Sequence, residues 1–229
     1  MAHYLVVGAA SGIGRSVLQK LIGQGHTVTA TYHTSTPEQL PGVNWYQVDV
    51  REEIQDTLIP AQLDGVVYCP GSIQLKPFHR IYHDDFIADY SLQVGGLIRV
   101  LQKAFPVLKQ SPHAAVVTFS TVAVQRGFNF HSLVSASKGA IEGLTRALAA
   151  EWAPTIRVNS IAPSITDTPL ASALLNTAEK REANAQRHPL KRIGTPEDIA
   201  NAVVFLLSPQ SAWMTGEILH IDGGMHSIK

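Results

Sequence analysis

The sequence is short of charge and has no excess of either sign, and this already excludes several classes of protein. Its 229 residues include 18 Lys and Arg and 18 Asp and Glu, so the formal net charge is zero, while 45% of residues are hydrophobic. Such a chain can bury enough apolar surface to fold, unlike a disordered tail. The sequence has no basic run that would follow a phosphate backbone, so we expect small-molecule partners and neither nucleic acid nor a membrane.

Cysteine and long apolar stretches are also scarce. The single cysteine, Cys69, excludes an intramolecular disulfide and a multi-cysteine metal site. Histidine spacing indicates no metal site, and the acids of His83-Asp84-Asp85 are better explained as helix caps. The sequence has no apolar run of about 18 residues and no basic region before a long apolar segment near Met1. We therefore expect a soluble chain in the cytoplasm that binds no metal.

Short apolar runs alternate with amphipathic stretches along the whole chain. The amphipathic stretches include 15–23 and 135–151, and the runs expected to form strands are 4–7, 27–32, 45–48, 66–68, 115–120, 157–161 and 217–221. Buried strands alternating with helices imply right-handed crossovers and a parallel sheet covered on both faces. We expect one α/β domain over residues 1–229, doubly wound, with a mostly parallel sheet of about seven strands and helices on both faces.

Residues 166–190 interrupt this alternation. The segment is polar and rich in alanine, and it carries no strand pattern. Long connections of this kind in a compact domain are usually functional. We interpret it as a mobile helical excursion that acts as a substrate lid rather than as a linker between domains.

A glycine-rich turn follows the first expected strand. It reads Gly8-Ala9-Ala10-Ser11-Gly12-Ile13-Gly14 and leads into the first amphipathic stretch. At such a turn, backbone N–H groups and the helix dipole can hold a pyrophosphate, and glycine lets the backbone approach it closely. An ordinary tight turn is the alternative, but three glycines at the first crossover favour the dinucleotide site of a Rossmann domain.

The end of the second expected strand bears on which dinucleotide is bound. A carboxylate there accepts hydrogen bonds from the ribose of NAD, whereas the 2′-phosphate of NADP repels it. The sequence is Tyr32-His33-Thr34-Ser35, which has three hydroxyls and an imidazole but no carboxylate and no arginine. This favours NADP(H) over NAD(H), although the same residues also suit a plain polar loop.

Further motifs follow along the chain. They are Asp49-Val50, Val134-Ser135-Ala136-Ser137-Lys138-Gly139, Arg157-Val158-Asn159-Ser160-Ile161-Ala162-Pro163, Pro189 to Asp198, Thr215-Gly216-Glu217 and Asp222-Gly223-Gly224. With the glycine turn, they make the chain resemble the short-chain dehydrogenase/reductase family over essentially its whole length. It is similar to the 3-oxoacyl-carrier-protein reductase branch.

The resemblance implies a cofactor site, a small-molecule substrate and a homo-oligomer, either a tetramer or a dimer. The family usually builds its oligomers through the long helix at 135–151 and the last strand. Carried over position by position, the implied cofactor-binding residues are Gly8, Ser11, Gly12, Ile13, Gly14, Tyr32, His33, Thr34, Asp49, Val50, Gly71, Lys138, Pro163, Thr166 and Thr168.

The catalytic part of the resemblance is altered. The family transfers hydride between a nicotinamide and a carbonyl or alcohol carbon with the help of Tyr, Lys, Ser and Asn. Here Lys138 is retained, but Val134 stands at the Tyr position and Thr121 at the Ser position. Gln93 takes the place of Asn. Ser120, one residue earlier on a strand, would point to the opposite face from Thr121.

His131 is a candidate replacement for the missing proton donor. It precedes Lys138 by seven residues, which places the two on similar faces if the helix extends that far. This spacing resembles that of Tyr and Lys in the enoyl-carrier-protein reductases, and imidazole titrates near neutrality. A solvated loop histidine is the alternative interpretation. Tyr68 and Tyr90 are weaker candidates.

Two functions follow from these residues. The first is an NADP(H)-dependent oxidoreductase for a carbonyl, an alcohol or an activated alkene, with a non-standard proton donor. Phe128, Phe130 and the segment 170–175 suggest an apolar substrate pocket without selecting a compound. The second is an NADP(H)-binding pseudo-oxidoreductase with little or no redox activity, acting as a binding or regulatory protein. General acid help is typically worth ~10²–10⁴-fold, so slow turnover is compatible with Val134.

Overall fold

Seven parallel strands form one sheet, and the chain winds outward from its centre in both directions. The computed structural model describes residues 1–228. The strands are β1 (His3–Val7), β2 (Thr27–Tyr32), β3 (Val43–Gln47), β4 (Gly65–Tyr68), β5 (Ala114–Phe119), β6 (Ile156–Pro163) and β7 (Ile218–Ile221). Their order is β3-β2-β1-β4-β5-β6-β7, and every neighbouring pair is parallel. The predicted fold class is confirmed, with a sheet that is entirely parallel.

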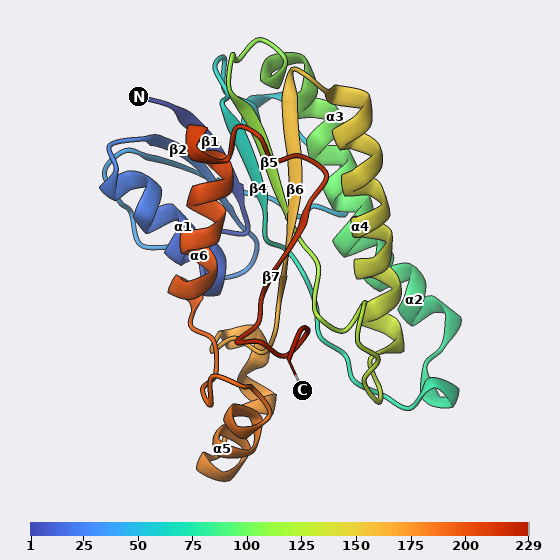
Figure 1. The fold of residues 1–229 in the computed structure, drawn as a ribbon. Coiled ribbons are helices and arrows are strands. Elements are labelled where there is room, and N and C mark those ends of the chain that lie inside the picture. The colour runs from blue at the N-terminus through green and yellow to red at the C-terminus, as the bar shows by residue number, and fades with distance from the viewer. Residues whose placement is uncertain (229) are drawn as a thin grey trace.

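Helices cover both faces of the sheet (Figure 1). Helices α1 (Gly12–Gly23) and α6 (Pro196–Leu207) pack on one face, and α3 (Gly96–Leu108) and α4 (Ser132–Trp152) pack on the other. Helix α2 (His83–Tyr90) leads through a π-helical turn, η3 (Ser91–Gly95), into α3. The short 3-10 helices are η1 (Asp56–Leu58), η2 (Phe78–Arg80), η4 (Pro169–Leu174) and η5 (Pro209–Ser211).

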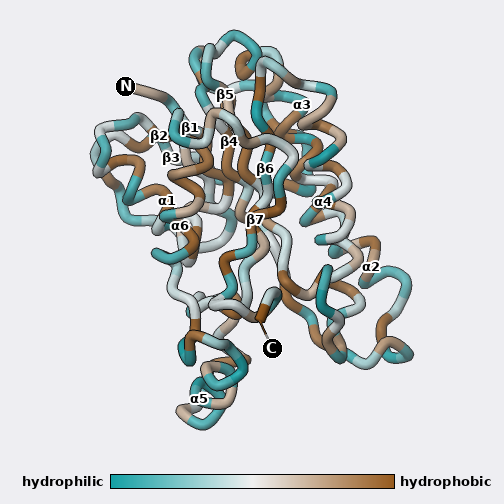
Figure 2. Tube along the Cα trace, in the orientation of Figure 1, coloured by the Kyte–Doolittle hydropathy of each residue, from teal (hydrophilic) through white to brown (hydrophobic). Residues whose placement is uncertain are grey.

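Alternation along each strand divides the core into two halves. On β1, the side chains of Leu5 and Val7 join the core beneath α3 and α4, whereas those of Tyr4 and Val6 join the core beneath α1 and α6. This is the two-residue period of an extended chain that is buried on both faces. Figure 2 shows the result, with hydrophobic residues concentrated along the central strands between the two helical layers.

The segment 166–190 is helical, as expected, and lies beyond the carboxyl end of β6. It contains η4 and helix α5 (Ala178–Gln186), whose surface is largely hydrophilic (Figures 1 and 2). An isolated bridge between Thr166 and Gly194 closes its base. Its role as a substrate lid stays a prediction, as does the homo-oligomer.

Two helical glycines provide a matched test of the packing. A Cβ on Gly96, at the start of α3, would lie 2.3 Å from the Tyr68 hydroxyl oxygen and 2.9 Å from the Val50 side chain. The Tyr68 ring is buried and its hydroxyl donates to the Leu92 carbonyl at 2.6 Å, so the ring is held in place. A Cβ on Gly143, in the middle of α4, would meet no atom within 4 Å.

We expect Gly96→Ala to lower the free energy of unfolding by about 1–3 kcal/mol, because the core must be overpacked. Gly143→Ala should raise it by about 0.5–1 kcal/mol, because alanine is the better helix former. Urea unfolding with matched m-values measures both changes. Equal effects of the two substitutions would contradict this description of the packing around Gly96.

Candidate functional site

The glycine turn lies at the carboxyl end of β1, beside the point where the strand order reverses. Gly8 and Gly12 have φ values of +77° and +52°, a region that favours glycine. A Cβ on Gly14 would lie 2.2 Å from the carbonyl oxygen of Gly8, so only glycine fits there. The turn therefore presents bare backbone at the start of α1, as a pyrophosphate requires.

Two cavities meet at this edge of the sheet. One has a volume of about 510 Å³ and runs from the glycine turn past the ends of β2 and β3. The other, of about 260 Å³, lies under η4. They share Ile13, Cys69, Gly71, Thr168 and Leu170. Each of the fifteen residues expected to bind the cofactor lines one cavity or both, so the structure brings the whole set together.

The first cavity contains a basic residue that the sequence analysis missed. Arg51 lies two residues after Asp49, and its guanidinium donates to both carboxylate oxygens of Asp49, at 2.9 Å and 2.6 Å. These hydrogen bonds hold the pKa of Asp49 well below its usual range. His33 Nε2 lies 3.4 Å from the same carboxylate. Arg51 lies four residues after the last residue of β3, and a basic residue so near the end of that strand was the signal available in the sequence.

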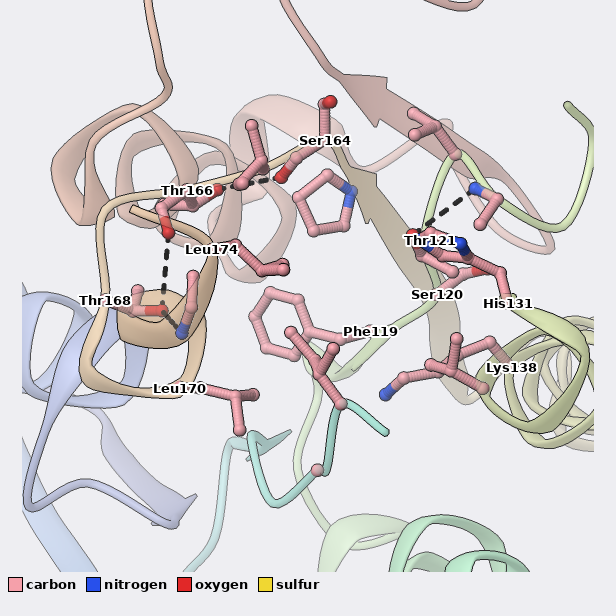
Figure 3. Close-up of a pocket in the computed structure, with 18 of the residues that line it drawn as sticks. Phe119, Ser120, Thr121, His131, Lys138, Ser164, Thr166, Thr168, Leu170 and Leu174 are labelled. Carbon is pink, nitrogen blue, oxygen red and sulfur yellow. Dashed lines mark hydrogen bonds between the residues drawn. The ribbon is translucent and has the colours of Figure 1, made fainter. Parts of the chain in front are cut away.

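The second cavity is mainly apolar and is shown in Figure 3. Its apolar lining includes Ile73, Leu75, Phe119, Ala123, Phe128, Val134, Leu170 and Leu174. Phe128 and part of the segment 170–175 lie where they were expected. Phe130 does not: it has a φ of +69°, is 54% exposed and is not part of the lining. The prediction that Phe130 contributes to the pocket was wrong, because the left-handed backbone there turns the ring away.

Lys138 projects from α4 into this second cavity (Figure 3). The residue is buried, and burial lowers the pKa of its amine to about 8, against the opposing effect of the Asp89 carboxylate. Val134, one helical turn earlier, lines the same cavity and is also buried. The position where the family resemblance implies a tyrosine thus offers only methyl groups.

Thr121 and Ser120 follow β5 and differ in what they bind. The Ser120 hydroxyl donates to the buried Glu142 carboxylate at 2.6 Å. The Thr121 hydroxyl oxygen accepts a hydrogen bond of 3.3 Å from the Ala123 amide, which leaves its own proton for another acceptor. Figure 3 shows Thr121 on the same side of the cavity as His131 and Lys138.

His131 is the N-cap residue of α4 and lines the cavity. Its Nδ1 lies 2.8 Å from the Asn129 carbonyl oxygen. Because a carbonyl only accepts, Nδ1 carries a proton in this contact, and Nε2 remains to exchange one with a ligand. Helix α4 begins at Ser132, directly after His131, and both His131 and Lys138 line the second cavity.

Gln93 lies in the π-helical turn η3 and also lines the second cavity. The two tyrosines considered as alternative proton donors do not reach it. The Tyr68 hydroxyl donates its hydrogen bond to the Leu92 carbonyl, and Tyr90 is 47% exposed on α2. Neither tyrosine lines the second cavity, so the structure does not support either as a proton donor there.

Residues 1–228 contain no group of three or more His, Cys, Asp and Glu side chains that could hold a metal ion. Asp85 accepts a hydrogen bond from the Tyr82 amide, so this acid caps α2. Over the same residues, every helix is too short or too polar to span a membrane.

Comparison with known sequences identifies relatives over nearly the whole chain. Residues 8–226 match the family model described as Enoyl-(Acyl carrier protein) reductase. A tropinone reductase homolog from Arabidopsis thaliana is 32% identical over 240 residues, which cover 96% of this chain and 78% of the relative. L-xylulose reductase from Bos taurus is 31% identical over 230 residues, which cover 96% of this chain and 94% of that enzyme.

Solved structures share the same architecture. A short chain dehydrogenase family protein from Francisella tularensis is 26% identical, with a TM-score of 0.89 and 98% of each chain covered. The structure of ElxO with NADP bound is 25% identical, with a TM-score of 0.89, covering 99% of this chain and 100% of ElxO. The chain belongs to the short-chain dehydrogenase/reductase family of oxidoreductases.

Proposed function

We propose that the protein is an NADP(H)-dependent oxidoreductase that acts on a carbonyl, an alcohol or an activated alkene, with His131 as the proton donor. The observation that carries this proposal is the convergence of Thr121, His131 and Lys138 on one apolar cavity that adjoins the glycine-lined cavity. The nicotinamide cofactor supplies the hydride when bound. The matched family model and the reductase relatives support both carbonyl and alkene substrates.

Each side chain has a role that its position allows. The backbone of Gly8–Gly14 and the N-terminus of α1 hold the pyrophosphate. The Lys138 ammonium holds ribose hydroxyls and stabilises negative charge that develops at the reacting oxygen. The Thr121 hydroxyl donates to that oxygen and fixes its place. The His131 imidazolium gives its Nε2 proton to the product and takes one back in the reverse direction.

The preference for NADP(H) rests on the polar end of β2. His33, Thr34 and Ser35 line the first cavity without a carboxylate among them, and Arg51 is held nearby by Asp49. A 2′-phosphate is an anion that accepts hydrogen bonds from hydroxyl, imidazole and guanidinium groups. ElxO, a relative in fold, binds NADP in its solved structure.

We expect the protein to bind NADPH more tightly than NADH, and Thr34→Asp to weaken NADPH binding at least about tenfold, or ~1.4 kcal/mol, through charge repulsion. Isothermal titration calorimetry with both nucleotides measures this. Thr155→Asp is the control, because Thr155 is exposed before the amino end of β6, at the opposite edge of the sheet. Equal affinity of the wild type for NADH and NADPH would refute the preference.

A second candidate is a pseudo-oxidoreductase that binds NADP(H) without redox turnover. The observation that favours it is the buried Val134, which has no proton to donate. In this case the cofactor is a ligand or a structural element, and the chain acts as a binding or regulatory protein.

Substitutions at positions 131 and 134 separate the two candidates. For the oxidoreductase we expect NADPH oxidation with members of a carbonyl and enone panel. His131→Gln should lower kcat about 10²-fold while the Kd for NADPH is retained, because only proton transfer is affected. His113→Gln, an exposed residue before the amino end of β5, is the control.

For the pseudo-oxidoreductase we expect NADPH binding without oxidation in the wild type. Gain of carbonyl reduction by Val134→Tyr would show that Thr121 and Lys138 are still in register with the cofactor. Unchanged turnover in His131→Gln, with an active wild type, would rule out the proposed donor.

The charge of Lys138 makes cofactor binding depend on pH. Its pKa is lowered to about 8, so the amine is an ammonium below that pH and neutral above it. We expect the affinity for NADPH to fall as the pH rises through about 8. Lys138→Met should bind more weakly and lose this step, because methionine has a similar shape and does not titrate. Fluorescence titration of NADPH over a pH series measures the affinity of the wild type and of the variant. The same fall in affinity near pH 8 in Lys138→Met would show that Lys138 is not the titrating group.

A further inference from the structure

Asp89 is a buried carboxylate that the sequence analysis did not single out. It lies near the end of α2 and is 4% exposed. Asp84 and Asp85 on the same helix pair with His83 and Lys76, whereas Asp89 has no ion pair within residues 1–228. A buried carboxylate without a countercharge is costly unless hydrogen bonds satisfy it.

Three side chains donate to the Asp89 carboxylate. The Ser137 hydroxyl donates to Oδ2 at 2.6 Å, and the Ser72 hydroxyl donates to Oδ1. Gln93 Nε2 lies 2.9 Å from Oδ1 and 2.8 Å from Oδ2. Ser137 directly precedes Lys138 and Ser72 directly follows Gly71, so the carboxylate ties α2 and η3 to two walls of the second cavity.

These bonds decide which way the Gln93 amide faces. A carboxylate only accepts, so the Gln93 nitrogen must face Asp89 and the carbonyl oxygen must face away. Gln93 is fully buried, and its Oε1 has no hydrogen-bond partner within residues 1–228. Oε1 and Lys138 Nζ lie 3.4 Å and 3.7 Å from the point where Gly71 would carry a Cβ. An unpartnered acceptor and an amine therefore border the same small space.

We propose that Asp89 is a positioning residue: it holds the Gln93 carbonyl oxygen toward the cavity, where this oxygen and the Lys138 amine together bind a hydroxyl group. The hydroxyl donates its proton to Gln93 Oε1 and accepts a hydrogen bond from Lys138 Nζ. The inference deepens the proposed function and rests on it, because the hydroxyl belongs to the cofactor ribose or to an alcohol substrate.

Electrostatics support this arrangement. Burial lowers the pKa of Lys138, and the Asp89 carboxylate is the opposing charge that favours the ammonium. The other titratable or charged groups that line this cavity are Cys69, directly after β4, His131, at the start of α4, and Arg187, whose guanidinium lies over the Phe128 ring. Burial raises the pKa of Cys69 to about 12, so this thiol is neutral near pH 8. Asp89 is thus the nearby carboxylate that keeps Lys138 protonated.

The test substitution is Asp89→Asn, which preserves size and shape. The introduced NH₂ group replaces one of the two oxygens that accept from Gln93 Nε2, so the Gln93 amide loses its fixed orientation. Lys138 then loses a nearby carboxylate and the acceptor that Asp89 holds toward it. Competitive labelling of Lys138 with an amine-acylating reagent over a pH series, read by mass spectrometry, measures its pKa without any cofactor. We expect half-labelling to move down by about one pH unit.

An exchange variant and a surface variant control this experiment. Asp89→Asn combined with Gln93→Glu swaps the carboxylate and the amide, so an acceptor faces the cavity again and the half-labelling pH should return to the wild-type value or above. Asp84→Asn alters a fully exposed acid on the same helix and should leave it unchanged. Melting temperatures report any loss of stability. An unchanged half-labelling pH in Asp89→Asn, whatever its melting temperature, would overturn the proposal.

Binding measurements then locate the hydroxyl. A higher Kd for NADPH in Asp89→Asn, reversed in the exchange variant, supports a ribose hydroxyl. An unchanged Kd with a raised KM for an alcohol, also reversed, supports a substrate hydroxyl. If Kd and KM both stay unchanged, the hydroxyl contact is refuted. A wild type that binds no NADPH would defeat the proposed function, while the labelling result would still decide what Asp89 does to Lys138.

Discussion

The burial of the Lys138 amine is the constraint on which the arrangement of the site depends. Moving an ammonium out of water is costly, and the apolar side chains of the second cavity replace much of its hydration. The cost is limited because the Asp89 carboxylate lies nearby and the long helix α4 holds the lysine against the sheet. A ligand oxygen that accepts a hydrogen bond from this amine would favour its charged form.

The parallel sheet explains why so many separate segments reach this amine. All seven strands point the same way, so the turns after β1, β4, β5 and β6 meet at one edge. At that edge the absence of side chains matters as much as their presence, because the backbone at Gly14 has no room for a Cβ. The two cavities share Ile13, Gly71 and Thr168, so one elongated ligand can contact both the glycine turn and Lys138.

Sequence reasoning predicted what is local or periodic. The apolar runs placed the strands, and the glycine turn and motif spacing brought every expected cofactor residue to the cavity edge. It failed where the outcome depends on contacts between distant segments. Asp89 stands four residues before Gln93, which could be read from the sequence, but its burial depends on Ser72 and Ser137 from two other elements. The position of Phe130 was predicted wrongly, because the sequence around it does not indicate a left-handed backbone.

Val134 affects both the supply of a proton at the site and the protonation state of Lys138. A tyrosine at this position would bring a hydroxyl that can share a proton with the lysine, whereas valine brings apolar surface that increases its desolvation. Valine therefore offers no proton at this position, and its apolar surface disfavours the ammonium form of Lys138. The buried Asp89 carboxylate favours the ammonium, and His131 is the proton donor that we propose in place of a tyrosine. The three positions are coupled through one cavity, so the proton chemistry of this site belongs to the group rather than to any single side chain.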